Sequence, residues 1–247
     1  MGKPVSDKNR IGKKSVTSEG YSVTCVAYRK YRDVDVQFDD GTIVSTTWAN
    51  FERGFIKNPN HRSLRGIGFL GVGAYTIKDS DGNKSKAYNS WAAMIERCFT
   101  EPLTTVCEEW TNYQVFAEWF CNNYYECNNE VMQLDKDILV KGNTHYSPDT
   151  CCIVPSSINY MFTRNKYKRG AYPIGVCKVT NSKRFVATIS VNNTNKSLGR
   201  FDTIKEAFEA YKVAKEFEVR RVAAEYKDIL PKNVYEAMMS YEVEEDD

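Results

Sequence analysis

The chain has 247 residues, of which 42% are hydrophobic and 27% charged, and its formal net charge is +2. This composition is typical of a globular protein and excludes a disordered chain. No stretch approaches the roughly 20 apolar residues of a membrane span, and no apolar run follows the N-terminus as in a secretory signal. We therefore expect a cytoplasmic protein with no membrane partner.

Residues 1–60 are predicted to form a small antiparallel β module. Apolar and polar residues alternate around Val23 and Cys25, and again from Val34 to Phe38. Asp40-Gly41 then precedes a further apolar pair, and Asp-Gly between two alternating runs is a strong hairpin signal. We expect an accessory module.

Residues 61–165 are predicted to form a central α/β region that begins with a glycine-rich turn. Apolar residues recur at helical spacing in two segments, residues 85–100 and 108–126, and a loop-rich stretch follows them. The expected core positions of the two helices are Trp91, Met94, Ile95 and Cys98, then Trp110, Phe116, Trp119 and Phe120.

The eight cysteines contain no C-x-x-C pair, and the chain has only two histidines. A structural zinc site usually takes four close ligands in two short-spaced pairs. We therefore expect buried free thiols. The alternative is that the four cysteines from Cys98 to Cys127 converge on a metal.

Residues 166–247 are predicted to form three short strands and a long helix, with a last short helix at residues 233–242. In the middle strand, Arg184, Thr188 and Ser190 point away from the side that packs on the helix. Asp202 or Thr203 is the expected N-cap, and Glu206 is placed for a capping box. The expected apolar stripe of the helix is Ile204, Ala207, Phe208, Tyr211, Ala214 and Phe217. The three segments together predict an α+β fold.

Charge is strongly segregated along the chain. Residues 150–201 contain no Asp or Glu. In residues 96–137, by contrast, the charged side chains are mainly acidic. Such a block predicts a surface that faces a polyanion. Its basic residues are Arg164, Lys166, Lys168, Arg169, Lys178, Lys183, Arg184, Lys196 and Arg200.

The third segment resembles the DNA-binding domain of plant ethylene-response factors, the APETALA type, which also occurs in phage endonucleases. The matching residues are Gly175-Val176, "RFVATI" at 184–189, "LGRFDT" at 198–203 and "EAFEAY" at 206–211. The resemblance implies that the outer face of the sheet lies in the DNA major groove. The nucleic-acid-binding residues would be Lys178, Lys183, Arg184, Thr188, Ser190, Lys196 and Arg200. The chain has Cys177 and Thr188 where that family places arginines and tryptophans.

The stretch "LDKDILVKGNTHYSPDTCCIVPSSIN", residues 134–159, looks like the HNH nuclease unit of phage proteins. The resemblance implies catalytic roles for Asp135, Lys136, Asn143, His145 and Asn159, with Asp135 and Asn159 as ligands of Mg²⁺ or another divalent metal. Lys136 stands where the family has its general-base histidine. A lysine ordinarily holds its proton about four pH units higher than a histidine does.

These patterns predict a phage-type nucleic-acid-binding protein on an HNH endonuclease-like scaffold, with DNA as its partner and with nuclease activity reduced or lost. One alternative is an active, metal-dependent HNH endonuclease of the homing type. A second is a phage adaptor that acts on structured RNA or on a host protein complex, because the chain is rich in aromatic residues.

Overall fold

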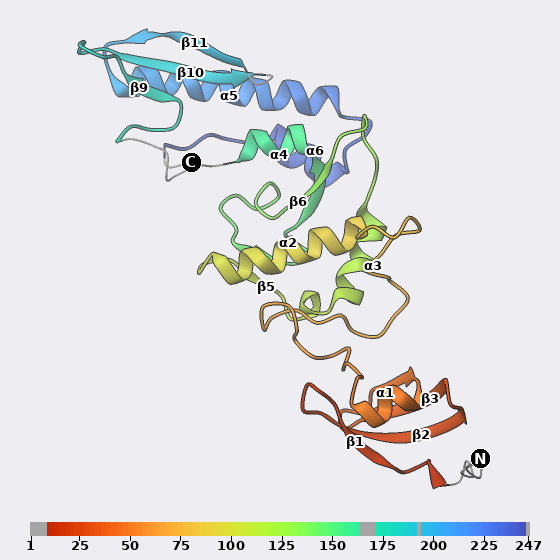
Figure 1. Ribbon diagram of the computed structural model, residues 1–247. Coiled ribbons are helices and arrows are strands. Elements are labelled where there is room, and N and C mark those ends of the chain that lie inside the picture. The colour runs from red at the N-terminus through yellow and green to blue at the C-terminus, as the bar shows by residue number, and fades with distance from the viewer. Residues whose placement is uncertain (1–8, 164–170, 192–193, 246–247) are drawn as a thin grey trace. The chain divides into compact units, whose positions relative to one another are not determined.

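The computed structural model describes residues 9–163, 171–191 and 194–245, and the protein has the predicted α+β fold (Figure 1). The chain divides into two compact units. The first is Met1–Phe99 with Glu108–Ala117, and the second is Thr100–Cys107 with Glu118–Asp247. The predicted boundaries at residues 60 and 165 stay predictions. None of the helices in the described ranges is both long and apolar enough to cross a membrane.

The first unit begins with the predicted antiparallel β module. Its strands β1 (Lys14–Val16), β2 (Ser22–Lys30), β3 (Asp33–Phe38) and β4 (Ile43–Thr46) pair in chain order. The β3–β4 turn contains Gly41 with φ +87°, which Asp40-Gly41 predicted. Helix α1 (Trp48–Arg53), capped by the Thr47 hydroxyl, covers the sheet with Trp48 and Phe51. Alternate residues of β2 and β3 complete the core: Val23, Cys25, Val34, Val36 and Phe38.

Helix α2 (Lys86–Thr100) agrees with its prediction, and Trp91, Met94 and Ile95 are buried. The second predicted helix is interrupted. A 3₁₀ turn, η2 (Glu109–Thr111), precedes α3 (Tyr113–Asn123), because Asn112 is extended and its side chain accepts a hydrogen bond from the Gln114 amide.

The second unit contains two short strand pairs. Strand β5 (Thr105–Val106) runs parallel to β7 (His145–Tyr146), and β6 (Met132–Asp135) runs antiparallel to β8 (Cys152–Pro155). Helix α4 (Ser156–Phe162) follows β8 directly. Glu130 fixes the start of this helix by accepting hydrogen bonds from the Ser157 amide and the Tyr226 hydroxyl.

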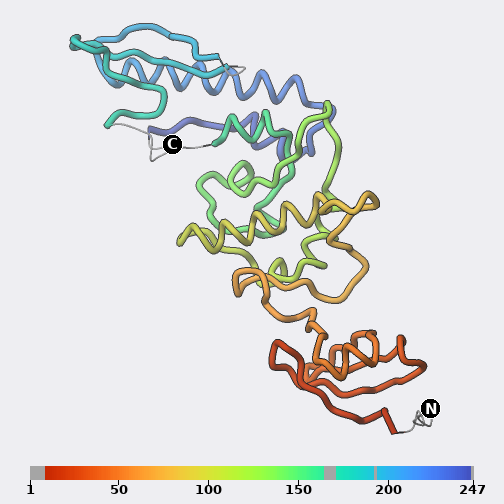
Figure 2. The backbone as a smooth tube through the Cα atoms, viewed as in Figure 1, coloured from red at the N-terminus to blue at the C-terminus, as the bar shows by residue number. Residues whose placement is uncertain are grey.

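The C-terminal part has the predicted three-stranded antiparallel sheet on a long helix. Strands β9 (Val176–Lys178), β10 (Phe185–Val191) and β11 (Thr194–Phe201) lie in the order β11-β10-β9. Helix α5 (Ile204–Glu225) runs along one face of this sheet (Figures 1 and 2). Thr203 and Glu206 form the predicted capping box. The predicted last helix is α6 (Lys232–Met239).

Helix α5 contributes to two hydrophobic cores. Ala207, Phe208 and Tyr211 pack against the sheet, whereas Val219 and Ala223 pack in a second cluster with β8, α4 and α6. The predicted apolar stripe was therefore wrong at its two ends. Ile204 is 37% exposed and Phe217 67% exposed, because the buried stripe continues through Val219 instead.

Candidate functional site

The strand register defines which side chains of the C-terminal sheet point away from α5. Ala187 and Ile189 are buried in the core shared with α5, so the residues that alternate with them point outward. We call this surface the outer sheet face. It comprises Cys177, Arg184, Val186, Thr188, Ser190, Asn195, Ser197 and Arg200.

The outer sheet face is mainly polar and exposed, with Val186 and Thr188 half-buried. Thr188 lies opposite Ser197, Ser190 lies opposite Asn195, and Val186 lies opposite Arg200. Arg184 Nε is 2.8 Å from Asp202 Oδ1, and both side chains are more than half exposed. The structure thus brings four of the predicted nucleic-acid-binding residues onto one face: Arg184, Thr188, Ser190 and Arg200.

The other three predicted cations lie elsewhere. Lys196 is opposite the buried Ile189 and so belongs to the helix side, where it helps Arg221 to lower the pKa of Glu218. Lys178 lies opposite Phe185, which packs against the core, but it is exposed at the end of β9. Lys183 lies in the loop before β10. Arg164, Lys166, Lys168 and Arg169 lie outside the described residues.

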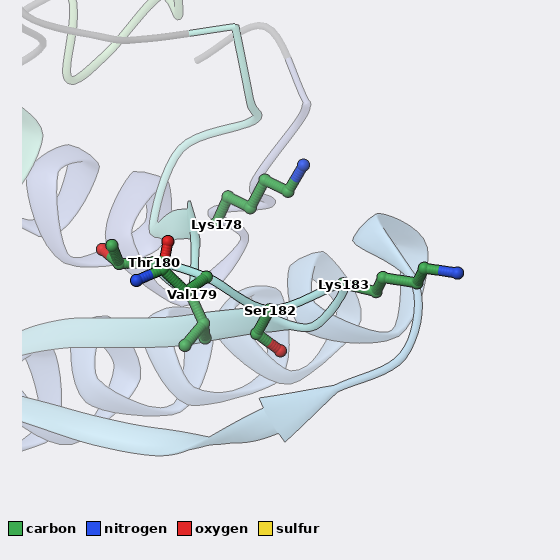
Figure 3. A pocket seen from close by; sticks show the side chains of 6 residues that line it. Lys178, Val179, Thr180, Ser182 and Lys183 are labelled. Atoms are coloured by element: carbon green, nitrogen blue, oxygen red, sulfur yellow. The ribbon is translucent and has the colours of Figure 1, made fainter.

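The loop between β9 and β10 forms an open hollow (Figure 3). Asn181 turns the chain with φ +56°, and the Ser182 amide donates to the Val179 carbonyl. Lys178 and Lys183 both line the hollow, and in Figure 3 their side chains extend in different directions. This loop therefore adds two cations at one end of the sheet.

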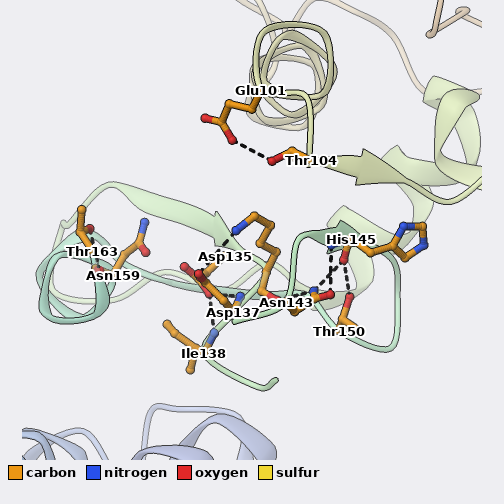
Figure 4. A network of polar contacts seen from close by, with 11 residues as sticks. Glu101, Thr104, Asp135, Asp137, Ile138, Asn143, His145, Thr150, Asn159 and Thr163 are labelled. Carbon is orange, nitrogen blue, oxygen red and sulfur yellow. Dashed lines mark hydrogen bonds and ion pairs between the residues drawn. The ribbon is translucent and has the colours of Figure 1, made fainter. Parts of the chain in front are cut away.

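Asp135 ends β6 and is only 8% exposed. The loop that follows it, residues 136–144, lies in the stretch that resembles the HNH unit, and we call it the nuclease-like loop. Its Oδ1 accepts hydrogen bonds from the amides of Asp137 and Ile138, at 2.8 and 2.7 Å (Figure 4). Burial and the charge of Asp137 raise the pKa of Asp135 to about 6, although the two amides oppose that shift. The carboxylate therefore acts as a cap of the loop.

Asn143 closes the same loop. Its Nδ2 donates to the carbonyls of Lys136 and His145, both at 2.7 Å, and its Oδ1 accepts from the His145 amide. The His145 ring is exposed, and its Nδ1 lies 2.9 Å from Thr105 Oγ1. In Figure 4 that ring points away from Asp135. The Lys136 Nζ instead reaches Asp137 Oδ2 at 3.5 Å.

Asn159 lies on α4 beside β6, and its Nδ2 donates to Gln133 Oε1 at 2.5 Å. This set of donors does not fit a divalent metal. Asp135 Oδ1 already serves two amides, and Lys136 brings a positive charge to the position of the family's histidine. Within the described ranges, no three Cys, His, Asp or Glu side chains lie close enough together to hold a metal ion.

Sequence reasoning missed some residues of these surfaces. Asn195 and Ser197 complete the outer sheet face, and Gln133 is the partner of Asn159. Strand alternation about Thr188 and Ser190 is the signal that finds the first two, once the pairing of β10 with β11 is known.

All eight cysteines are free thiols. Cys25, Cys127, Cys151 and Cys152 are buried as expected, and burial raises the pKa of each of these thiols. Cys121 and Cys177 are exposed, against the expectation.

No protein-family model, curated protein sequence or solved structure matches the chain.

Proposed function

We propose that this is a phage-type nucleic-acid-binding protein on an HNH endonuclease-like scaffold, which acts in the host cytoplasm on DNA and has reduced or lost nuclease activity. The observation that carries the proposal is the outer sheet face. All of its residues lie within a stretch of 52 residues without a carboxylate, residues 150–201, and Arg184 pairs with Asp202 just beyond that stretch.

Duplex DNA suits this surface better than a small ligand does. A β-ribbon fits the major groove, where hydroxyl and amide side chains can pair with base edges. The central row of Thr188, Ser190, Asn195 and Ser197 supplies such groups. Arg200 and the β9–β10 loop lysines supply cations for the flanking phosphates.

The nuclease-like loop supports the second half of the proposal. Asp135 ends β6, Asn143 lies in the loop before β7, and Asn159 lies on α4. Lys136 stands where the resembled family has its general-base histidine, and its Nζ lies 3.5 Å from Asp137 Oδ2. The nearest histidine in the chain, His145, is turned away from Asp135 (Figure 4).

Arg200→Ala and Lys183→Ala test the binding surface. We expect each to weaken binding of a duplex oligonucleotide and to reduce the slope of log K against log salt by about 0.9, because each removes about one phosphate contact. Fluorescence anisotropy at several salt concentrations measures both effects. Lys227→Ala, which removes an exposed lysine beyond the end of α5, is the matched control. Equal behaviour of all three variants would contradict binding through the outer sheet face.

Incubation of supercoiled plasmid with Mg²⁺ or Mn²⁺ tests for loss of cleavage. We expect binding without nicking. Nicking by the wild-type protein that is lost in both Asp135→Asn and His145→Ala would show instead that the protein is an endonuclease with an unusual base. Nicking that persists in both variants would indicate a contaminating nuclease and is checked by repurification.

A further inference from the structure

Three separate segments of the N-terminal module meet at one end of its sheet. Residues 10–13 run beside the middle of β2, where the Gly12 amide donates to the Cys25 carbonyl. The β2–β3 turn lies at the same end, and the Trp48 amide at the start of α1 donates to the Tyr31 carbonyl. We call this the cationic end and define it by Arg10, Lys13, Lys30, Tyr31, Arg32 and Trp48.

Aromatic rings hold two cations in place at this end. The Arg10 guanidinium carbon lies 4.3 Å from the centroid of Tyr28 and 4.8 Å from that of Trp48. Lys13 Nζ lies 5.8 Å from the Trp48 centroid. Arg10 Nη1 donates a hydrogen bond to the Tyr28 hydroxyl. A guanidinium has five N–H donors, so the others can still bind an anion.

The β2–β3 turn adds an exposed ring between two more cations. Tyr31 is 52% exposed, and Lys30 and Arg32 on either side of it are also exposed. The nearby strand carboxylates of Asp33 and Asp35 are both bonded to Arg29, 2.7 Å from each. The cations of the turn and of residues 10–13 therefore outnumber the carboxylates beside them.

We propose that the cationic end binds single-stranded nucleic acid, with Tyr31 stacking on a base and Arg10, Lys13, Lys30 and Arg32 contacting the backbone. A positive groove next to an exposed aromatic ring is the common arrangement for single strands, because only an unpaired base offers its face for stacking. This surface belongs to a different unit from the outer sheet face, so the inference does not depend on the proposed function.

The test is binding of a fluorescent single-stranded oligonucleotide to the full chain, in an Arg200→Ala background that weakens the C-terminal surface. Lys30→Ala with Arg32→Ala should reduce affinity about tenfold and the salt slope by about 1.4, since each phosphate of a single strand contributes about 0.7. Arg53→Ala with Lys57→Ala removes two exposed cations elsewhere on the same module and should leave both quantities unchanged.

Tyr31 separates stacking from charge. Tyr31→Ala should reduce affinity about tenfold at an unchanged salt slope, and Tyr31→Phe should retain the wild-type affinity, because the ring is kept.

Three outcomes would overturn the proposal. The first is an equal loss of affinity in Lys30→Ala with Arg32→Ala and in Arg53→Ala with Lys57→Ala. The second is an equal loss of affinity in Tyr31→Ala and Tyr31→Phe. The third is that a polyglutamate probe of matched length binds as tightly as the oligonucleotide. The last outcome would show a general anion surface. If the single-strand test fails but Arg200→Ala still weakens binding of duplex DNA, the proposed function is unaffected.

Discussion

The side chain of Asp135 stabilises the loop that leaves β6, because Oδ1 accepts hydrogen bonds from two successive backbone amides. A carboxylate in this role pays a desolvation penalty, since Asp135 is buried and Asp137 lies close by. An amide in its place would keep the acceptor oxygen without the charge. The Asp135 carboxylate therefore has a structural role in this loop.

Asp135→Asn tests this role through the pH dependence of stability. The folded state raises the pKa of Asp135 from 3.8 to about 6, so the carboxyl favours the folded state below pH 3.8, and this contribution is lost as the pH rises through 6. The variant should equal the wild type near pH 4 and be more stable at pH 7.5, by up to about 3 kcal/mol. Hydrogen exchange of the β6 amides at the two pH values measures the difference.

The control for that experiment is Asp149→Asn, which neutralises an exposed carboxylate between β7 and β8. It should change stability equally little at both pH values. If Asp135→Asn also has the same effect at pH 4 and 7.5, burial of the charge does not govern this loop.

At the level of elements, the features that depend on neighbouring residues were predictable. The capping box of Thr203 and Glu206 and the turn at Gly41 follow from a few adjacent residues. The paired strands β5 and β7 were not predictable, because two residues each show no periodicity. The same holds for the break at Asn112, where the apolar pattern continues through the 3₁₀ turn.

The candidate binding face shows the same limit. Alternation along β10 placed Thr188 and Ser190 correctly on one side. Lys196 and Arg200 share the same parity along β11, yet only Arg200 is on the outer sheet face. The register shift between Ala187 and Thr188 leaves Leu198 as an extra residue in β11, and this bulge reverses the alternation between the two cations.

At the level of the whole second unit, α5 physically joins the sheet to the nuclease-like region. Its first half packs on β9 and β10 and its second half on β8, α4 and α6. Lys215, between the two halves, donates from Nζ to the Met161 carbonyl near the end of α4. The residues of β8 and α4 that contact α5 lie 50 or more residues before their partners in the chain. The apolar periodicity of the helix alone cannot identify contacts at such a separation.

Val219→Ala tests whether α5 makes these two regions one cooperative structure. Val219 is fully buried in the cluster of β8, α4 and α6, so the substitution should cost about 2 kcal/mol. If α5 unfolds as a whole, the sheet loses its covering helix at the same time. The slowest-exchanging amides of β10 should then lose about as much protection as those of β6 and β8, in hydrogen exchange at neutral pH. Val213→Ala, on the exposed side of α5, should change neither region. Loss of protection confined to β6 and β8 would mean that the outer sheet face folds independently of the β6–β8 region, and that the two are connected only by the chain.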